Sequence, residues 1–174
     1  MNKLQRNFFA RDVLEVAPEL LGRNLVRKVD NQIEKYLITE VEAYRGEKDL
    51  ACHASKGRTP RTEIMYHDGG LVYVYLIYGM YWMLNVVTSI NEIPQAVLIR
   101  GIKGFDGPGK LTKKLKIDKS FYGEDLINSD RIWIESNENF KDLKIETTPR
   151  IGIEYAGEWK HKPWRFIISE KNDH

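Results

Sequence analysis

The chain has 174 residues, of which 42% are apolar and 30% are charged, and its formal net charge is +2. This length suits one folded domain with a buried core, and the composition does not indicate a disordered or fibrous protein. A single cysteine, Cys52, cannot form an internal disulfide, so a secreted scaffold held by disulfide bridges is not indicated. Residues 1–7 lack the apolar run of a secretory signal, and the apolar stretch 71–87 is interrupted by tyrosines, Gly79 and Asn85. We therefore expect an intracellular protein with no membrane partner.

Alternating and helical apolar patterns predict a series of short helices and strands. In chain order they are a helix over residues 11–21, strands over 24–29 and 32–44, a helical turn over 49–54, a helix over 59–66, strands over 71–77, 81–88 and 95–102, a helix over 110–117, and strands over 131–135 and 163–169. Residues 151–158 are expected to be irregular. The fold class predicted is α+β: a single mixed domain over residues 1–174, with a curved, largely antiparallel sheet flanked by helices and a protruding β-hairpin.

Capping residues and prolines indicate where two of the helices begin and bend. Asp12 is the expected N-cap of the first helix, and Pro18 within it predicts a break or kink near Ala17. Thr59 and Pro60 are the expected cap and first residue of the helix over 59–66.

The strand over 32–44 carries an unusual set of polar side chains near its end. Glu40, Glu42 and Tyr44 alternate with apolar residues, so they are expected to share one face of the sheet. Arg100 lies near the end of another apolar strand, from which a cation can project into a site from a rigid support.

Five segments of the chain resemble the alkyladenine (3-methyladenine) DNA glycosylases of the mammalian type. The segments are TEVEAYRGEKDLACH (39–53), TPRTEIMYHDGGLVYVYLIYGMYWMLNV (59–86), AVLIR (96–100), GPGKLTKKLKI (107–117) and PRIGIEYAGEWKHKPWRF (149–166). Together with the residues between them they cover nearly the whole chain from Phe8 onward. The resemblance implies a base-excision-repair enzyme that flips a damaged purine out of duplex DNA and hydrolyses its N-glycosidic bond with water. The lesions implied are 3-methyladenine, 7-methylguanine, ethenoadenine and hypoxanthine.

The resemblance also implies a catalytic group of three residues. Glu42 would deprotonate and aim the attacking water, while Arg100 and the main-chain carbonyl of Ile151 would hold that water. Arg100 would in addition reach a phosphate beside the flipped nucleotide. A carboxylate suits this chemistry, because glycosidic hydrolysis passes through a positively charged sugar and needs a base near its anomeric carbon.

Four further residues would form the base pocket by the same resemblance. Tyr44, His53 and Tyr75 would be its aromatic walls, and His53 would donate a main-chain hydrogen bond to the base. Aromatic walls suit many purines, because every base has a π face. Asn85 would exclude guanine by clashing with its 2-amino group.

Four other residues would contact the DNA around the pocket. Tyr78, with Met80 in the same turn, would enter the minor groove and fill the gap left by the flipped nucleotide. Arg61 and Lys110 would meet phosphates, in keeping with the basic runs 56–61 and 110–119. The expected partner is double-stranded DNA that contains damaged purines, and a monomer is expected.

Structural explanations compete with several of these roles. Glu42 could be an exposed strand residue in an ion pair, Tyr75 and His53 could pack in the core, Tyr78 could fold back on the sheet, and Asn85 could bind backbone groups. Two other functions also remain open. A non-catalytic nucleic-acid-binding module would not need Glu42 with Arg100, and a nucleosidase acting on free nucleosides would not need an exposed Tyr78.

No metal or other cofactor is expected, because Cys52 and His53 have no partner pair at ligand spacing. The position of Glu42 holds no lysine, so no Schiff base and no strand cleavage are expected. Relative to the mammalian type, the connection over residues 100–107 is short and the N-terminal tail is shorter, which affects DNA and partner contacts rather than the chemistry.

Overall fold

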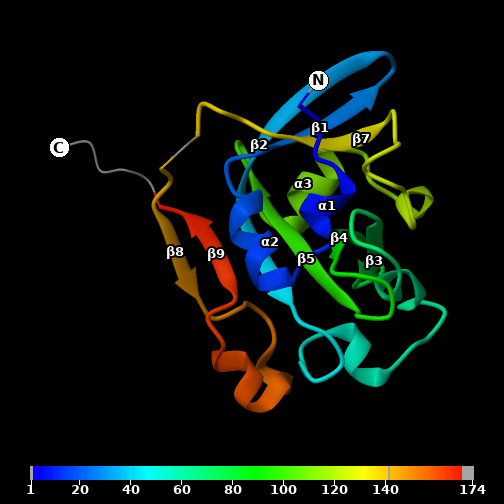
Figure 1. Cartoon of the computed structure of the whole chain (residues 1–174), viewed down its shortest axis with the longest axis vertical. Helices are drawn as coiled ribbons and strands as arrows, with labels where there is room; N and C mark the ends of the chain where they lie inside the picture. The colour runs from blue at the N-terminus through cyan, green and yellow to red at the C-terminus, as the bar shows by residue number, and fades with distance from the viewer. Residues whose placement is uncertain (1, 141, 170–174) are drawn as a thin grey trace.

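The computed structural model describes residues 2–140 and 142–169 (Figure 1). Its helices and strands, in chain order, are α1 Arg6–Phe9, α2 Val13–Leu20, β1 Asn24–Val29, β2 Gln32–Tyr44, η1 His53–Lys56, η2 Glu63–Tyr66, β3 Val72–Ile77, β4 Tyr81–Thr88, β5 Gln95–Ile102, β6 Phe105–Asp106, α3 Pro108–Lys114, η3 Lys119–Phe121, β7 Ile132–Glu135, β8 Ile145–Thr148, η4 Glu154–His161 and β9 Arg165–Ile168, where η marks a 3-10 helix.

The strands form one curled antiparallel sheet that resembles half a barrel. Its main order is β3-β4-β5-β2-β1-β7, with β6 paired to β5 and the β8–β9 pair attached to β2. The 13-residue strand β2 is the central element, because its first part pairs with β1 and its last part pairs with β5 and β9. The predicted fold class, α+β with a curved and largely antiparallel sheet, is confirmed.

The two faces of this sheet have different roles. Helices α2 and α3 pack against β2, β4 and β5 (Figure 1), and Val97 and Ile99 of β5 belong to the core cluster on this side. Side chains alternate along a strand, so Ala96 and Leu98 point to the other face, where they line a cavity. The helices therefore support the sheet from behind the site.

The first long helix is shorter than the sequence predicts. Asp12 caps it as expected, with its Oδ1 accepting the N–H of Leu14 at 2.9 Å. The helix does not break near Ala17, because it continues through Pro18 to Leu20. Pro18 removes only the hydrogen bond that its own nitrogen would give to Leu14, and the helix ends two residues later.

Three other local predictions need correction. Thr59 does not cap a helix that begins at Pro60; its side chain and that of Thr62 exchange hydrogen bonds with each other's main-chain N–H groups, at 3.2 and 2.9 Å, and only η2 follows. The last predicted helix begins two residues earlier and ends at Lys114. Strand β8 was not predicted. Its four residues are mostly exposed, so no apolar face marks it in the sequence.

Candidate functional site

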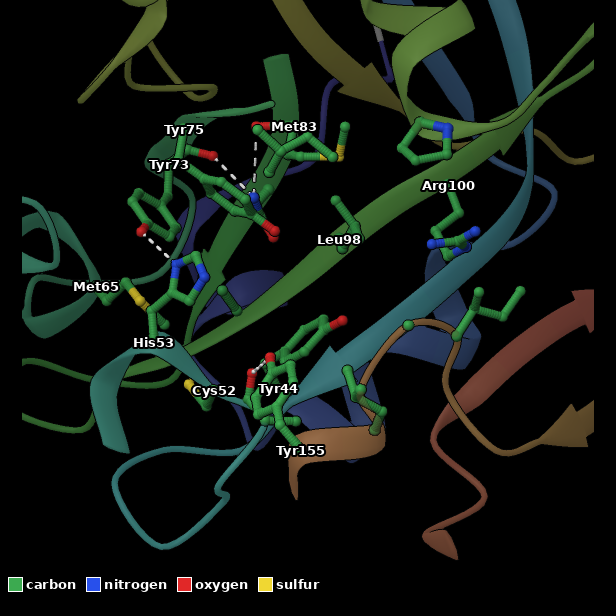
Figure 2. Close-up of a pocket in the computed structure, with 18 of the residues that line it drawn as sticks. Tyr44, Cys52, His53, Met65, Tyr73, Tyr75, Met83, Leu98, Arg100 and Tyr155 are labelled. Atoms are coloured by element: carbon green, nitrogen blue, oxygen red, sulfur yellow. Dashed lines mark hydrogen bonds between the residues drawn. The ribbon is translucent and has the colours of Figure 1, made fainter. Parts of the chain in front are cut away.

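A cavity of about 440 Å³, whose lining side chains are drawn in Figure 2, opens on the face of the sheet to which Ala96 and Leu98 point. This volume lies within the range of small-molecule sites. The cavity is lined from β3, β4, β5 and the end of β2, and from residues 51–53 and 151–155. Its walls are rich in rings: Tyr44, His53, Tyr73, Tyr75 and Tyr155. The cavity can therefore enclose a flat aromatic ligand.

Glu42 is fully buried directly behind this wall. Its Oε1 accepts the hydroxyl of Tyr44 at 2.9 Å, and its Oε2 accepts the main-chain N–H of Ile151 at 2.7 Å. Nη1 of Arg100 lies 3.6 Å from Oε1. These three partners of Glu42 line the cavity, so the carboxylate lies just behind the residues of the cavity wall. The alternative of an exposed glutamate in a surface ion pair is wrong.

Burial raises the pKa of Glu42 above that of an exposed glutamate. The charge of Arg100 and the hydrogen bonds from Ile151 and Tyr44 act in the opposite direction but do not offset it. Proton transfer is most efficient when the pKa of the base lies close to the working pH. The site thus holds a carboxylate that is more basic than usual, fixed on both oxygens.

The contact of Ile151 with Glu42 comes from its amide N–H, whereas the sequence analysis assigned a role to its carbonyl. The side chain of Ile151 is 49% exposed and adds little to the core. Residue 151 therefore binds Glu42 through its main-chain N–H, a contact that was not predicted, and the role expected of its carbonyl in holding the water stays a prediction.

Arg100 belongs to a group of two arginines and two glutamates. Its Nε donates to Oε1 of Glu40 at 3.0 Å, and Nε of Arg165 donates to the same oxygen at 2.7 Å. The pairing of β2 with β5 is irregular on both sides of Glu40, and such bulges change the direction of a side chain. Glu40 thereby holds the Nε end of the Arg100 guanidinium group, and Nη1 of the same group faces Glu42.

His53 and its neighbours form one wall of the cavity. The His53 ring lies 4.5 Å from the ring of Tyr75, edge to face, and its Nδ1 is 2.8 Å from the hydroxyl of Tyr73. Burial lowers the pKa of His53 to about 4, helped by the charges of Arg61 and Lys56, so the ring is neutral at pH 7.

The Tyr73 hydroxyl and Nδ1 of His53 share one hydrogen bond. Burial raises the pKa of Tyr73 to about 12, so its hydroxyl keeps its proton. Either group can be the donor in this bond, because a neutral imidazole carries its proton on one of its two nitrogens and a tyrosine hydroxyl can both donate and accept. Nε2, the second nitrogen of His53, faces the cavity (Figure 2), where it can donate or accept a hydrogen bond.

Asn85 is buried in β4, and part of its side chain is committed to the backbone. Its Nδ2 donates to the carbonyl of Tyr73 at 3.2 Å and, less closely, to that of Met83 at 3.5 Å. The structural explanation raised for this residue is therefore supported. The residue also lines the cavity, so these bonds hold its side chain rigidly in the wall.

Tyr78 protrudes from the tip of the β3–β4 hairpin beside the cavity. The strands pair up to Ile77 and Tyr81, and the three residues between them form the turn. Tyr78 is 87% exposed and Met80 is 63% exposed, so the alternative that Tyr78 folds back on the sheet is wrong. The φ of Tyr78 is +51°, a left-handed conformation that costs energy for a bulky residue.

The two basic residues assigned to phosphates are both exposed. The guanidinium of Arg61 lies 5.1 Å from the centre of the Tyr75 ring, which it covers from outside. Lys110 lies in α3, whose Gly109 packs so closely on Tyr81, the first residue after the hairpin turn, that a Cβ there would lie 2.9 Å from the ring. Arg61 thus contacts the cavity wall, and Lys110 lies in the helix that packs against the hairpin beside its turn.

Comparisons with known proteins establish the family. The model of the methylpurine-DNA glycosylase family matches residues 7–106 and 103–172. The chain belongs to this family. It is therefore a DNA repair enzyme that cleaves N-glycosyl bonds.

Similar proteins come from bacteria and an archaeon. One from Legionella pneumophila (strain Corby) is 45% identical over 177 residues, which cover 98% of this chain and 96% of that protein. One from Desulfitobacterium hafniense (strain Y51) is 42% identical over 198 residues, covering 98% and 97%. One from Methanocella arvoryzae is 43% identical over 186 residues, covering 95% and 92%. Each is named as a proposed 3-methyladenine DNA glycosylase. None of the three is mammalian, so likeness to the mammalian type stays a prediction.

Several residues that build the site of this methylpurine-DNA glycosylase were not predicted from the sequence. Arg165 shares Glu40 with Arg100, and a buried pair of Arg150 and Asp49 lies beneath Tyr44 and Ile151. The partners in each of these contacts are far apart in the chain, so no local sequence pattern could have predicted that they meet. Tyr73 could have been found, because it alternates with Tyr75 on one face of a predicted strand.

The residues that the structure describes contain no group of three or more histidine, cysteine, aspartate or glutamate residues placed to hold a metal ion. They also contain no helix long and apolar enough to cross a membrane.

Proposed function

We propose that the chain excises alkylated and deaminated purines, 3-methyladenine first among them, from duplex DNA and leaves an abasic site. The observation that carries this proposal is a buried carboxylate, Glu42, whose pKa is raised and which lies directly behind an aromatic cavity. We further propose that residues 1–174 act as one domain and as a monomer inside the cell, with the damaged duplex as the partner.

The damaged base would be held between Tyr44 on one side and His53 with Tyr75 on the other. Stacking on aromatic side chains contributes about 1–3 kcal/mol per base. A purine alkylated on a ring nitrogen carries positive charge, which electron-rich tyrosine rings attract. The pKa of His53, about 4, keeps that ring neutral, so it does not repel such a base.

Hydrolysis would use water as the nucleophile and Glu42 as the base. The water oxygen forms a bond to C1′ of the sugar, while the bond from C1′ to the purine nitrogen breaks and its electron pair leaves with the base. A cationic alkylated purine therefore leaves as a neutral base, whereas a neutral purine such as hypoxanthine leaves as an anion and takes up a proton from solvent water. The water proton passes to Glu42. The positive charge that develops on the sugar is stabilised by the same carboxylate, and Arg100 and the Ile151 amide keep its two oxygens in place.

Selection and DNA binding would fall to residues at the wall and rim, in the manner of the mammalian type. Asn85 is fixed by its bonds to backbone carbonyls and cannot turn aside, so a 2-amino group on guanine would meet a rigid obstacle. Tyr78 would occupy the gap in the base stack, with Met80 beside it. Arg61 and Lys110 would bind phosphates around the flipped nucleotide.

The test compares three substrates. The protein is incubated with a duplex that contains one hypoxanthine, with methylated duplex DNA, and with free deoxyinosine, and the released bases are measured. We expect release from both duplexes and none from the nucleoside. Release from the nucleoside alone would show a nucleosidase, and tight binding of the duplex without release would show a non-catalytic module; either result would refute the proposal.

A further inference from the structure

A buried ion pair joins two loops beneath the proposed catalytic site. Nη1 of Arg150 lies 2.6 Å from Oδ2 of Asp49, and Nη2 lies 2.9 Å from Oδ1, so the pair is bidentate. Both side chains are completely buried. A buried ion pair is weak evidence for stability, because removing two charges from water opposes their attraction. Its presence beside a reactive carboxylate therefore calls for another explanation.

The guanidinium of Arg150 also contacts the strand that carries Glu42. Its Nη1 donates to the carbonyl of Ala43 at 3.0 Å, between Glu42 and Tyr44 in the chain. Its centre lies 4.9 Å from the ring of Tyr44 and 5.0 Å from that of Trp164. The planar group thus supports the Tyr44 wall of the cavity.

Asp49 organises the other loop. Its Oδ2 accepts the N–H of Arg45 at 3.0 Å, and its Oδ1 accepts that of Ala51 at 3.1 Å. Its main-chain carbonyl accepts the N–H of Cys52 at 2.9 Å. The next residue is His53, so the carboxylate sets the course of the chain into the opposite wall of the cavity.

Arg150 directly precedes the residue whose N–H binds Glu42 at 2.7 Å. We propose that Arg150 and Asp49 are positioning residues of the glycosylase site: their ion pair fixes the Ile151 amide on Glu42 and keeps the Tyr44 and His53 walls at a constant separation. This inference rests on the proposed function, because it assigns the pair a role in the rate of base release.

The pair also has an electrostatic connection to Glu42. The ionisable groups that face Glu42 are Arg100 from β5, Tyr44 from its own strand, Tyr75 from β3, Tyr155 from η4 and Arg150 itself. The Ile151 amide and the charge of Arg150 both lower the pKa of Glu42. A displaced amide therefore lets that pKa rise further, which is a signature that lost stability alone does not give.

The first test is Arg150→Lys, which keeps the charge but cannot keep the bidentate geometry. We expect the single-turnover rate of base release to fall about a hundredfold, the loss that misplacement on the order of 1 Å produces. The acid limb of the pH–rate profile, where the rate falls as Glu42 becomes protonated, should move to higher pH, while the affinity for the duplex changes little. A wild-type rate and a wild-type acid limb in the folded variant would overturn the inference.

A matched control separates positioning from stability. Arg27 is another buried arginine, held by the carbonyls of Leu115, Lys28 and Arg131 and remote from the cavity. Arg27→Lys should lower the melting temperature and leave the rate and the acid limb unchanged. If it slows base release as much as Arg150→Lys does, loss of stability explains both and the inference is wrong.

A double variant covers the case in which Arg150→Lys does not fold. Asp49→Leu with Arg150→Met removes both charges and leaves no buried charge without a partner, an exchange that proteins often tolerate. We expect a folded protein in which base release is still slow. A folded double variant with the wild-type rate and pH profile would contradict the proposal.

Hydrogen exchange gives a measurement that needs no activity. In Arg150→Lys the amide of Ile151 should exchange at least about tenfold faster than in the wild type, while the amide of Val26 in β1 stays unchanged. Equal exchange at Ile151 would overturn the inference. If the wild type releases no base at all, the proposed function fails, and this measurement still decides whether the pair positions the amide.

Discussion

Tyr78 can be tested by a change that separates folding from function. Tyr78→Asn removes the ring but suits the backbone, because asparagine tolerates the left-handed conformation that Tyr78 adopts at φ +51°. Only a small part of the tyrosine is buried, since it is 87% exposed, so the packing lost is within about 0.5 kcal/mol. We therefore expect the free energy of unfolding to stay the same or to rise by up to about 1 kcal/mol through relief of strain.

The rate of base release by Tyr78→Asn should fall, although the stability of the protein is kept. A ring that replaces lost base stacking is worth about 1–3 kcal/mol, which corresponds to a roughly 5- to 150-fold smaller population of the flipped state. Single-turnover base release from a hypoxanthine duplex should slow by that factor. Release from the same strand without its complement should change less than about threefold, since a single strand leaves little stacking to replace.

The control is Ile33→Thr, at an exposed apolar residue of the β1–β2 hairpin, which should leave both substrates unaffected. Equal losses on duplex and single strand in Tyr78→Asn would refute the wedge role. A clear fall in melting temperature would refute the reasoning on backbone strain.

Three further predictions follow from the cavity wall and rim. Asn85→Ala should cost about 1 kcal/mol of stability through its lost backbone hydrogen bonds and should allow release of guanine from undamaged duplex; unchanged discrimination would count against its role. Burial raises the pKa of Glu42 above 4.5, so the wild type loses stability as pH rises through that pKa and Glu42→Gln does not. The melting temperature of Glu42→Gln should therefore exceed that of the wild type by a margin that is smallest below pH 4.5, grows as pH rises from there to the pKa of folded Glu42, and stays constant above it; a margin that does not change with pH would contradict the burial argument. Arg61→Gln should reduce the slope of log affinity against log salt by about 1 and raise the pKa of His53, now about 4, in an NMR titration; an unchanged slope would mean that Arg61 only covers Tyr75.

Strands were the part of the fold that the sequence predicted best. Strands β1, β2, β4 and β5 have the predicted bounds to the residue, because apolar alternation and turn residues such as Asp30 and Asn31 are local signals. Strand β8 has no such signal. Its residues are stabilised as a strand only by pairing with β9, from which it is separated by residues 149–164.

In the candidate site, too, contacts within one strand could be predicted from the sequence, whereas contacts between residues far apart in the chain could not. The placement of Glu42 and Tyr44 on one face follows from the period of a strand, and they meet in a hydrogen bond. Asp49 and Arg150 are 101 residues apart, so no local pattern could bring them together. The resemblance identified the groups expected to react, and the structure added those that hold them.

The central claim is that Glu42 is the base that activates water, and single-turnover kinetics of Glu42→Gln test it most directly. The variant can keep the local geometry, because the Tyr44 hydroxyl can accept a hydrogen bond as well as donate one. Glu135→Gln is the matched control, at a buried glutamate bound by Lys35 and Trp133 outside the cavity. We predict that Glu42→Gln binds the hypoxanthine duplex as the wild type does and releases base about 10²–10⁴-fold more slowly, while Glu135→Gln is unaffected. Release by Glu42→Gln at the wild-type rate would contradict the account.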